Sequence, residues 1–157
     1  LSAALEQPDR FAGLVIVDGV CETSGIPQDR SAVRDHYADY VTGFVNACVP
    51  EPDSEHIKRW GRQILMRADP EAAARMFESH DTPRLAPDLS QVTVPTLVIH
   101  GERDAIVPLE LGVATAKAIP HAQFVVIPGA GHVPTMTRPA QVVAAINAWA
   151  ASSTLDL

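Results

Sequence analysis

The stretch that decides the fold lies at residues 94–104 and reads VPTLVIHGERD. Residues 122–132 repeat its form as AQFVVIPGAGH, and residues 11–19 have the same character as FAGLVIVDG. Each is a short apolar run rich in β-branched residues that ends in glycine, which is typical of a strand buried on both faces. The three runs therefore predict three strands of one parallel sheet.

Helical patterns separate and follow the later strands. Residues 109–120 place apolar side chains at helical spacing, and residues 138–150 form an amphipathic pattern that ends in AINAWA. Strand–helix–strand–helix alternation with continuously apolar strands predicts an α/β fold with right-handed crossovers and helices flanking the sheet.

Residues 22–90 depart from that alternation. They contain three helix-like stretches, at 28–49, 53–68 and 69–80, and no strand-like run. Asp53 and Asp69 are candidate caps for the second and third, since an aspartate before a helix can accept from its free amides. We therefore expect a helical insertion at 22–90 and a sheet-bearing core made of 1–21 and 91–157. We expect three aromatic residues of the insertion to pack inside it more readily than to line a substrate pocket; they are Tyr37, Tyr40 and Trp60.

Composition narrows the classes of function. The chain has 157 residues, about one domain, and its net charge of −7 disfavours nucleic acid and anionic membrane surfaces as partners. No apolar run approaches the length of about 18 residues that a membrane span needs. The two cysteines favour free thiols over a disulfide framework, and the six histidines lack metal-ligand spacing, so we expect no metal. No compartment is assigned, with the cytoplasm slightly favoured.

A carboxylate and an imidazole follow neighbouring strands. Asp104 comes after the strand at 94–101, and His132 comes after the next strand, 28 residues further on. Open α/β sheets place their chemistry at the carboxyl ends of the strands. A carboxylate there can accept the imidazole Nδ1–H and fix the tautomer in which Nε2 acts as a base.

These motifs resemble the last third of an α/β-hydrolase-fold protein. VPTLVIHGERDAIVP together with IPGAGHVPTMTRPAQVVAAINAW carries the resemblance, and LEQPDRFAGLVIVDG is similar to the helix and strand that follow the family's nucleophile elbow. The resemblance covers roughly 1–20 and 90–150. It implies that Asp104 is the triad acid, that His132 is the triad base, that 22–90 occupies the place of the cap domain and that no cofactor is needed.

The roles of several other residues are left open by the sequence. Asp18 is a second candidate for the acid, because some members of the family place it after this earlier strand. His100 is more readily a packing residue at the strand end than a ligand or a base. The family's nucleophile sits in G-x-S-x-G on a tight turn, and no such motif occurs in the 157 residues. Ser24 and Ser2 do not have the right surroundings. We therefore expect the nucleophile, the oxyanion hole and the N-terminal half of the fold to lie upstream of Leu1.

The resemblance implies hydrolysis of a carboxylic ester or related acyl bond of a small molecule, with the 157 residues alone inactive. Related chemistries in the family include epoxide, haloalkane and C–C bond hydrolysis, haloperoxidation and acyl transfer, which the unseen elbow residue would separate. The alternative is a non-catalytic, hydrolase-like binding or regulatory module within a larger protein. Whether the chain belongs to an enzyme therefore depends on that upstream sequence.

Overall fold

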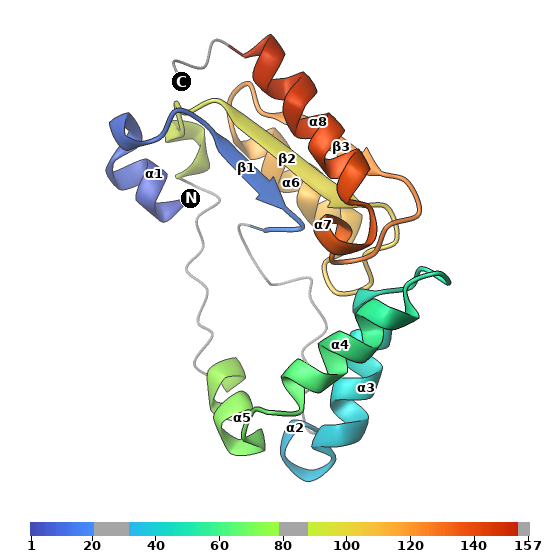
Figure 1. Cartoon of the computed structure of the whole chain (residues 1–157). Helices are drawn as coiled ribbons and strands as arrows, with labels where there is room; N and C mark the ends of the chain where they lie inside the picture. The colour runs from blue at the N-terminus through green and yellow to red at the C-terminus, as the bar shows by residue number, and fades with distance from the viewer. Residues whose placement is uncertain (21–31, 79–87, 154–157) are drawn as a thin grey trace.

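A sheet of three parallel strands forms the centre of the computed structural model, which describes residues 1–20, 32–78 and 88–153. The strand order is β1-β2-β3, so the middle strand is also the middle one in sequence (Figure 1). The parallel sheet expected from the three apolar runs is confirmed. The strands are β1 (Leu14–Val17), β2 (Thr96–Gly101) and β3 (Gln123–Ile127).

The register brings the ends of the strands to one edge. Val17 of β1 lies beside Ile99 of β2, and Gly101 of β2 lies beside Ile127 of β3. Every residue of β2 is buried, as expected for a central strand covered on both faces. The residues that follow β1 and β2 therefore leave the sheet at the same carboxyl edge.

Helices cover both faces of the sheet. On one face, α8 (Pro139–Ser152) packs Val142 and Trp149 against Leu97 and Ile99 of β2. On the other face, α6 (Leu109–Ala118) lies against β2 and β3, as Figure 1 shows behind the strands. Alternate residues of β2 point to opposite faces, which explains why its apolar run is continuous.

The beginning of the chain packs under the amino ends of the strands. Helix α1 (Ser2–Glu6) stops before Pro8, and a 3₁₀ turn, η1 (Pro8–Arg10), leads into β1. Ala4 joins a buried apolar cluster with Ile119 and with residues around the turn η2 (Leu89–Gln91). This cluster fixes the end of the sheet opposite to the candidate site.

In the described part of residues 22–90, four helices lie beyond the carboxyl ends of the strands (Figure 1). The expected helix at 28–49 is divided at His36 within its described part.

The structure tests the two predicted helix caps. Asp69 caps the last of these four helices by accepting from the Ala72 amide at 2.9 Å, which confirms that prediction. The prediction that Asp53 is a cap is wrong, because the helix begins at Glu55 and Ser54 occupies the cap position, with no side-chain cap bond. The helices are α2 (Ala32–Asp35), α3 (Tyr37–Cys48), α4 (Glu55–Leu65) and α5 (Pro70–Glu78).

The structure also bears on the expectations about membrane spans and about the cysteines. Among the described residues, none of the helices has the length and apolar character that crossing a bilayer requires. Cys48 carries a free, buried thiol, while Cys21 lies outside the described residues.

Candidate active site

The structure brings Asp104 and His132 together. The Oδ2 atom of Asp104 lies 2.8 Å from Nδ1 of His132, which is hydrogen-bond distance. The Asp104 side chain is fully buried, whereas a quarter of the His132 side chain remains exposed. The ring is thus bonded at Nδ1 to a buried carboxylate, and part of the His132 side chain is accessible to solvent.

The turn after β2 fixes the Asp104 carboxylate. Its Oδ1 atom accepts hydrogen bonds from the backbone amides of Ile106 at 2.8 Å and Val107 at 2.9 Å. Aspartate commonly closes such turns by bonding to amides two and three residues ahead. With Oδ1 engaged by the turn, Oδ2 is left directed at His132.

The loop after β3 carries His132 and is bound to the loop after β2. Arg103 donates its amide to the Ala130 carbonyl at 2.8 Å, and Glu102 accepts from the Gly129 amide at 2.7 Å. Gly129 has a φ of +69°, a conformation that glycine adopts without steric cost. Hydrogen bonds thus join the two loops that carry Asp104 and His132.

Opposing effects act on the His132 imidazole. Burial lowers its pKa, while the hydrogen bond and the negative charge of Asp104, with a smaller effect of Asp18, raise it by more. The net result is a pKa above the ordinary histidine value. An imidazole whose Nδ1–H is bound by a carboxylate presents Nε2 as its basic nitrogen.

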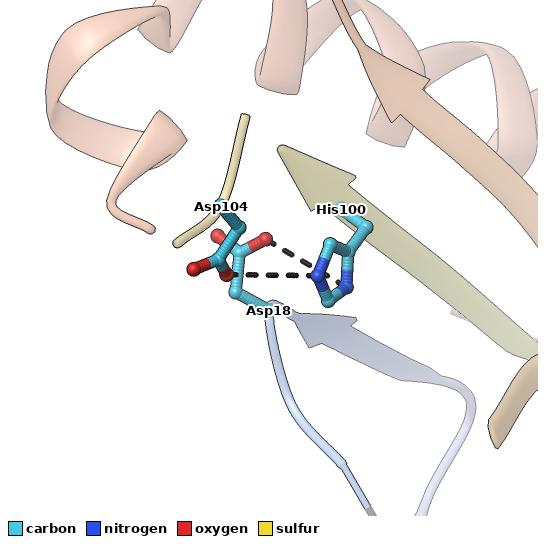
Figure 2. Close-up of side chains that lie close together, drawn as sticks. All are labelled: Asp18, His100 and Asp104. Atoms are coloured by element: carbon cyan, nitrogen blue, oxygen red, sulfur yellow. Dashed lines mark ion pairs between the residues drawn. The ribbon is translucent and has the colours of Figure 1, made fainter. Parts of the chain in front are cut away.

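Asp18 lies near this pair, but its contacts are with Gly101 and His100. Its Oδ1 atom accepts the Gly101 amide at 2.8 Å and lies 3.8 Å from Nδ1 of His100 (Figure 2). Burial, the largest effect, and the charge of Asp104 raise the pKa of Asp18 to about 6, against the lowering effect of the Gly101 amide and of His100. The hydrogen bond to His132 belongs to Asp104, so the geometry does not favour Asp18 as the rival acid.

His100 is a completely buried packing residue. Its Nε2 atom lies 3.0 Å from the Val107 carbonyl, to which it can only donate, and 3.5 Å from Oδ2 of Asp104. A Cβ added at Gly112 of α6 would overlap Nδ1, so the ring lies against the backbone of that helix.

His100, Asp18 and Asp104 are close enough to suggest a cation site. However, one ring nitrogen is engaged as a donor and the other is crowded by backbone, which does not suit a metal ligand.

Two residues at this site escaped the sequence analysis. Cys48 accepts the His132 amide through its carbonyl at 2.8 Å, and Glu51 accepts the Gly131 amide at 3.0 Å. Both come from the end of α3 and the Pro-Glu-Pro segment after it, which the sequence marks only as a helix boundary. Burial raises the pKa of the Cys48 thiol to about 12, which keeps it protonated and unsuited to act as a nucleophile. Ser24 lies outside the described residues.

Comparison with known proteins agrees with this architecture. A family model described as "Alpha/beta hydrolase family" matches residues 2–146. A pimeloyl-[acyl-carrier protein] methyl ester esterase of Nitrosomonas europaea is 30% identical over 92% of this chain and 64% of its own length. Among solved structures, a thermophilic esterase from Thermogutta terrifontis is 31% identical with a TM-score of 0.72, over 94% of this chain and 58% of that one. A bromoperoxidase from Bacillus anthracis is 25% identical with a TM-score of 0.69, over 78% of this chain and 47% of that one.

The chain belongs to the α/β-hydrolase family. The family match, the parallel sheet and the helices on its two faces all support this, and they confirm the resemblance inferred from the sequence. The 157 residues span less than two thirds of the length of these relatives and hold three strands of a partial fold.

Proposed function

We propose that this chain supplies the acid and base of a serine-type hydrolase that cleaves a carboxylic ester or a related acyl bond. The observation that carries the proposal is the 2.8 Å bond between Asp104 Oδ2 and His132 Nδ1, with the base partly open and the acid completely buried. The names of the relatives, two of which are esterases, favour acyl chemistry.

In this mechanism Nε2 of His132 takes a proton from the attacking hydroxyl and later returns it to the leaving alkoxide. Asp104 keeps the ring in the required tautomer and stabilises the imidazolium that forms between the two steps. Two backbone amides fix Oδ1 of Asp104, so the carboxylate keeps its orientation. Its hydrogen bond to Nδ1 therefore keeps the His132 ring in one orientation.

The nucleophile and the oxyanion donors belong, in this proposal, to sequence other than these 157 residues. No G-x-S-x-G is present, and the buried Cys48 thiol is a poor alternative. A segment that completes the fold is thus the partner that the site requires. Residues 22–90 act as the cap over the site, with α3 contributing the contact to the His132 loop. The substrate is a small ester-bearing molecule, and the chemistry needs no cofactor.

The test compares variants of a protein form that carries an elbow serine with the 157-residue chain alone. Hydrolysis of a short-chain p-nitrophenyl ester is expected in the longer form. The His132→Ala variant should lose about three or more orders of magnitude in kcat, because the proton shuttle is removed. His56→Ala, at an exposed position of α4, is the matched control and should keep full activity.

The outcomes separate the two classes of function. Near-normal turnover by the His132→Ala variant would show that another residue is the base. If no elbow nucleophile precedes the chain and the longer form is inert toward esters, the non-catalytic module becomes the better description. Turnover by the 157 residues alone, lost on His132→Ala, would place the nucleophile within them and overturn that part of the proposal.

A further inference from the structure

Two consecutive backbone amides of the His132 loop are bound by the helical layer instead of by the sheet. The Gly131 amide donates to Oε1 of Glu51 at 3.0 Å, and the His132 amide donates to the Cys48 carbonyl at 2.8 Å. Cys48 is the last residue of α3, and Glu51 follows it by three positions. The backbone that carries the candidate base is therefore fixed by a segment 80 residues away in the sequence.

The approach of the two segments is close enough to require glycine. A Cβ at residue 131 would overlap Cδ of Pro50 and the Cys48 carbonyl. Proline at 50 limits the freedom of its own backbone, so the segment at 48–51 is a stiff partner for the loop. Gly131 thus serves close packing here, in addition to any freedom it gives to the turn.

Apolar side chains also pack between the segment at 48–51 and the loops of the candidate site. Cys48, Val49 and Ile57 form a buried cluster, against which Ile106 and Val133 pack from the two loops of the candidate site. The cluster therefore includes residues beside both Asp104 and His132. A displacement of α3 and α4 would disturb the loops on which these two residues lie.

Glu51 is an unusual side chain for such a place. It is 1% exposed, and its second carboxyl oxygen, Oε2, has no hydrogen-bond partner among the described residues. A buried carboxyl group with one unsatisfied oxygen is costly, and an apolar side chain of similar size is often better for stability. Stability alone thus gives a weak reason for a glutamate here, whereas the bond to the Gly131 amide gives a specific one.

We propose that Glu51 is a positioning residue: its carboxyl group, together with the Cys48 carbonyl, sets the place of the His132 backbone and so couples the helical layer to the candidate base. The inference rests on the proposed function for its catalytic consequence, but the contact itself belongs to the 157 residues. In this arrangement, α3 and the base move as one unit.

The first experiment measures hydrogen exchange in the unmodified 157-residue chain. The Gly131 and His132 amides should exchange at rates close to those of the slowest amides in the last turns of α3, because they open only when the helical segment leaves. Exchange at the rate of a free loop amide, with α3 still protected, would overturn the proposal without any mutation.

The second experiment replaces Glu51 by methionine, which keeps much of the volume and removes the acceptor. In a form that hydrolyses esters, Glu51→Met should lower kcat about 10- to 100-fold with KM nearly unchanged, since a small misplacement of a catalytic group is costly. Glu51→Gln retains an acceptor oxygen and should restore most of kcat. Glu55→Met, at an exposed position four residues on, is the matched control and should keep kcat.

Each result decides a different question. An unchanged kcat in a folded Glu51→Met variant contradicts the positioning role, and so does a Glu51→Gln variant as impaired as Glu51→Met. If Glu51→Met does not fold, the glutamine variant and the exchange rates of the unmodified chain still decide. If His132→Ala keeps its activity, the proposed function fails, while the exchange measurement continues to test the contact on its own.

Discussion

At the scale of single residues, the candidate site is governed by where negative charge lies relative to one imidazole. Asp104 is fixed by its own turn, and Asp18 is fixed by the Gly101 amide, so the two carboxyl groups cannot exchange roles by small rotations. The two carboxyl groups therefore have different hydrogen-bond partners. Two predictions follow from this difference.

Asp104→Asn should lower the pKa of His132. The substitution removes the charge and the carboxylate bond that raise this pKa and leaves the burial that lowers it. Titration of the His132 ring protons by NMR in the 157-residue chain measures the change. In an active form, the base must be neutral, so activity falls as pH drops through the raised pKa of His132, and this midpoint should move to lower pH in the variant. A midpoint that moves upward would contradict the geometry.

Asp18→Asn should stabilise the fold at neutral pH. The folded-state pKa of Asp18 is raised from 3.8 to about 6, so between these values the folded state holds a proton that the unfolded state has released. Stability from this group therefore falls as pH rises from about 4 to 6 and then levels off.

Asparagine keeps an acceptor for Gly101 and tolerates the φ of +48° at this position, so the variant should gain roughly 1–3 kcal/mol at pH 8 and little at pH 4. Urea unfolding at both pH values measures the gain. Glu110→Gln, at an exposed position of α6, is the control. An equal gain at the two pH values would contradict the assignment.

At the scale of elements, close contact between a helix and a strand decides where the site can form. Helix α6 approaches β2 so closely that His100 lies against the backbone at Gly112. His100 in turn lies beside both carboxyl groups, 3.8 Å from Oδ1 of Asp18 and 3.5 Å from Oδ2 of Asp104 (Figure 2). The spacing of α6 from the sheet therefore controls the packing beneath the candidate acid.

Gly112→Ala should destabilise the fold, although alanine is the better helix former. The added Cβ would overlap His100, and overpacking of a core costs about 1–3 kcal/mol. Gly43→Ala in α3 is the matched control, because nothing lies within 4 Å of its added Cβ, and it should gain up to about 1 kcal/mol. Thermal unfolding of the two variants should shift in opposite directions. A stabilised Gly112→Ala variant would show that α6 is not held against His100.

At the scale of the whole molecule, one edge of the sheet has no neighbouring strand among the described residues. Within the described residues, β1 pairs only with β2, and Val15 of this strand is 40% exposed. An apolar strand with unpaired backbone groups invites association with another chain. In the longer form proposed above, we expect a further strand to cover this edge.

The 157-residue chain alone should self-associate as its concentration rises. Sedimentation velocity should show species larger than 16.8 kDa, and Val15→Lys should reduce them, because a charged side chain on an edge strand opposes pairing. Val143→Lys is the control, since Val143 is 54% exposed on α8, away from that edge. A monodisperse monomer at every concentration would show that the edge needs no partner, and the non-catalytic module would gain support.

The sequence by itself determined the parallel sheet, its flanking helices and the placing of His132 and its candidate acids at one edge of that sheet. These features follow from local information: apolar runs that end in glycine, helical periodicity, and the rule that parallel strands end at one edge. The cap at Asp69 was predictable for the same reason, since an aspartate followed by proline signals a helix start.

Only the tertiary structure decided which carboxyl group bonds His132 and what holds the His132 loop. Asp18 and Asp104 both follow strands, and three-dimensional contacts alone assign one to the imidazole and the other to the Gly101 amide. The burial of Glu51 against Gly131 joins residues 80 positions apart, and no periodicity encodes such a contact. Local patterns specify elements, whereas the partner of a buried polar group depends on how distant segments pack.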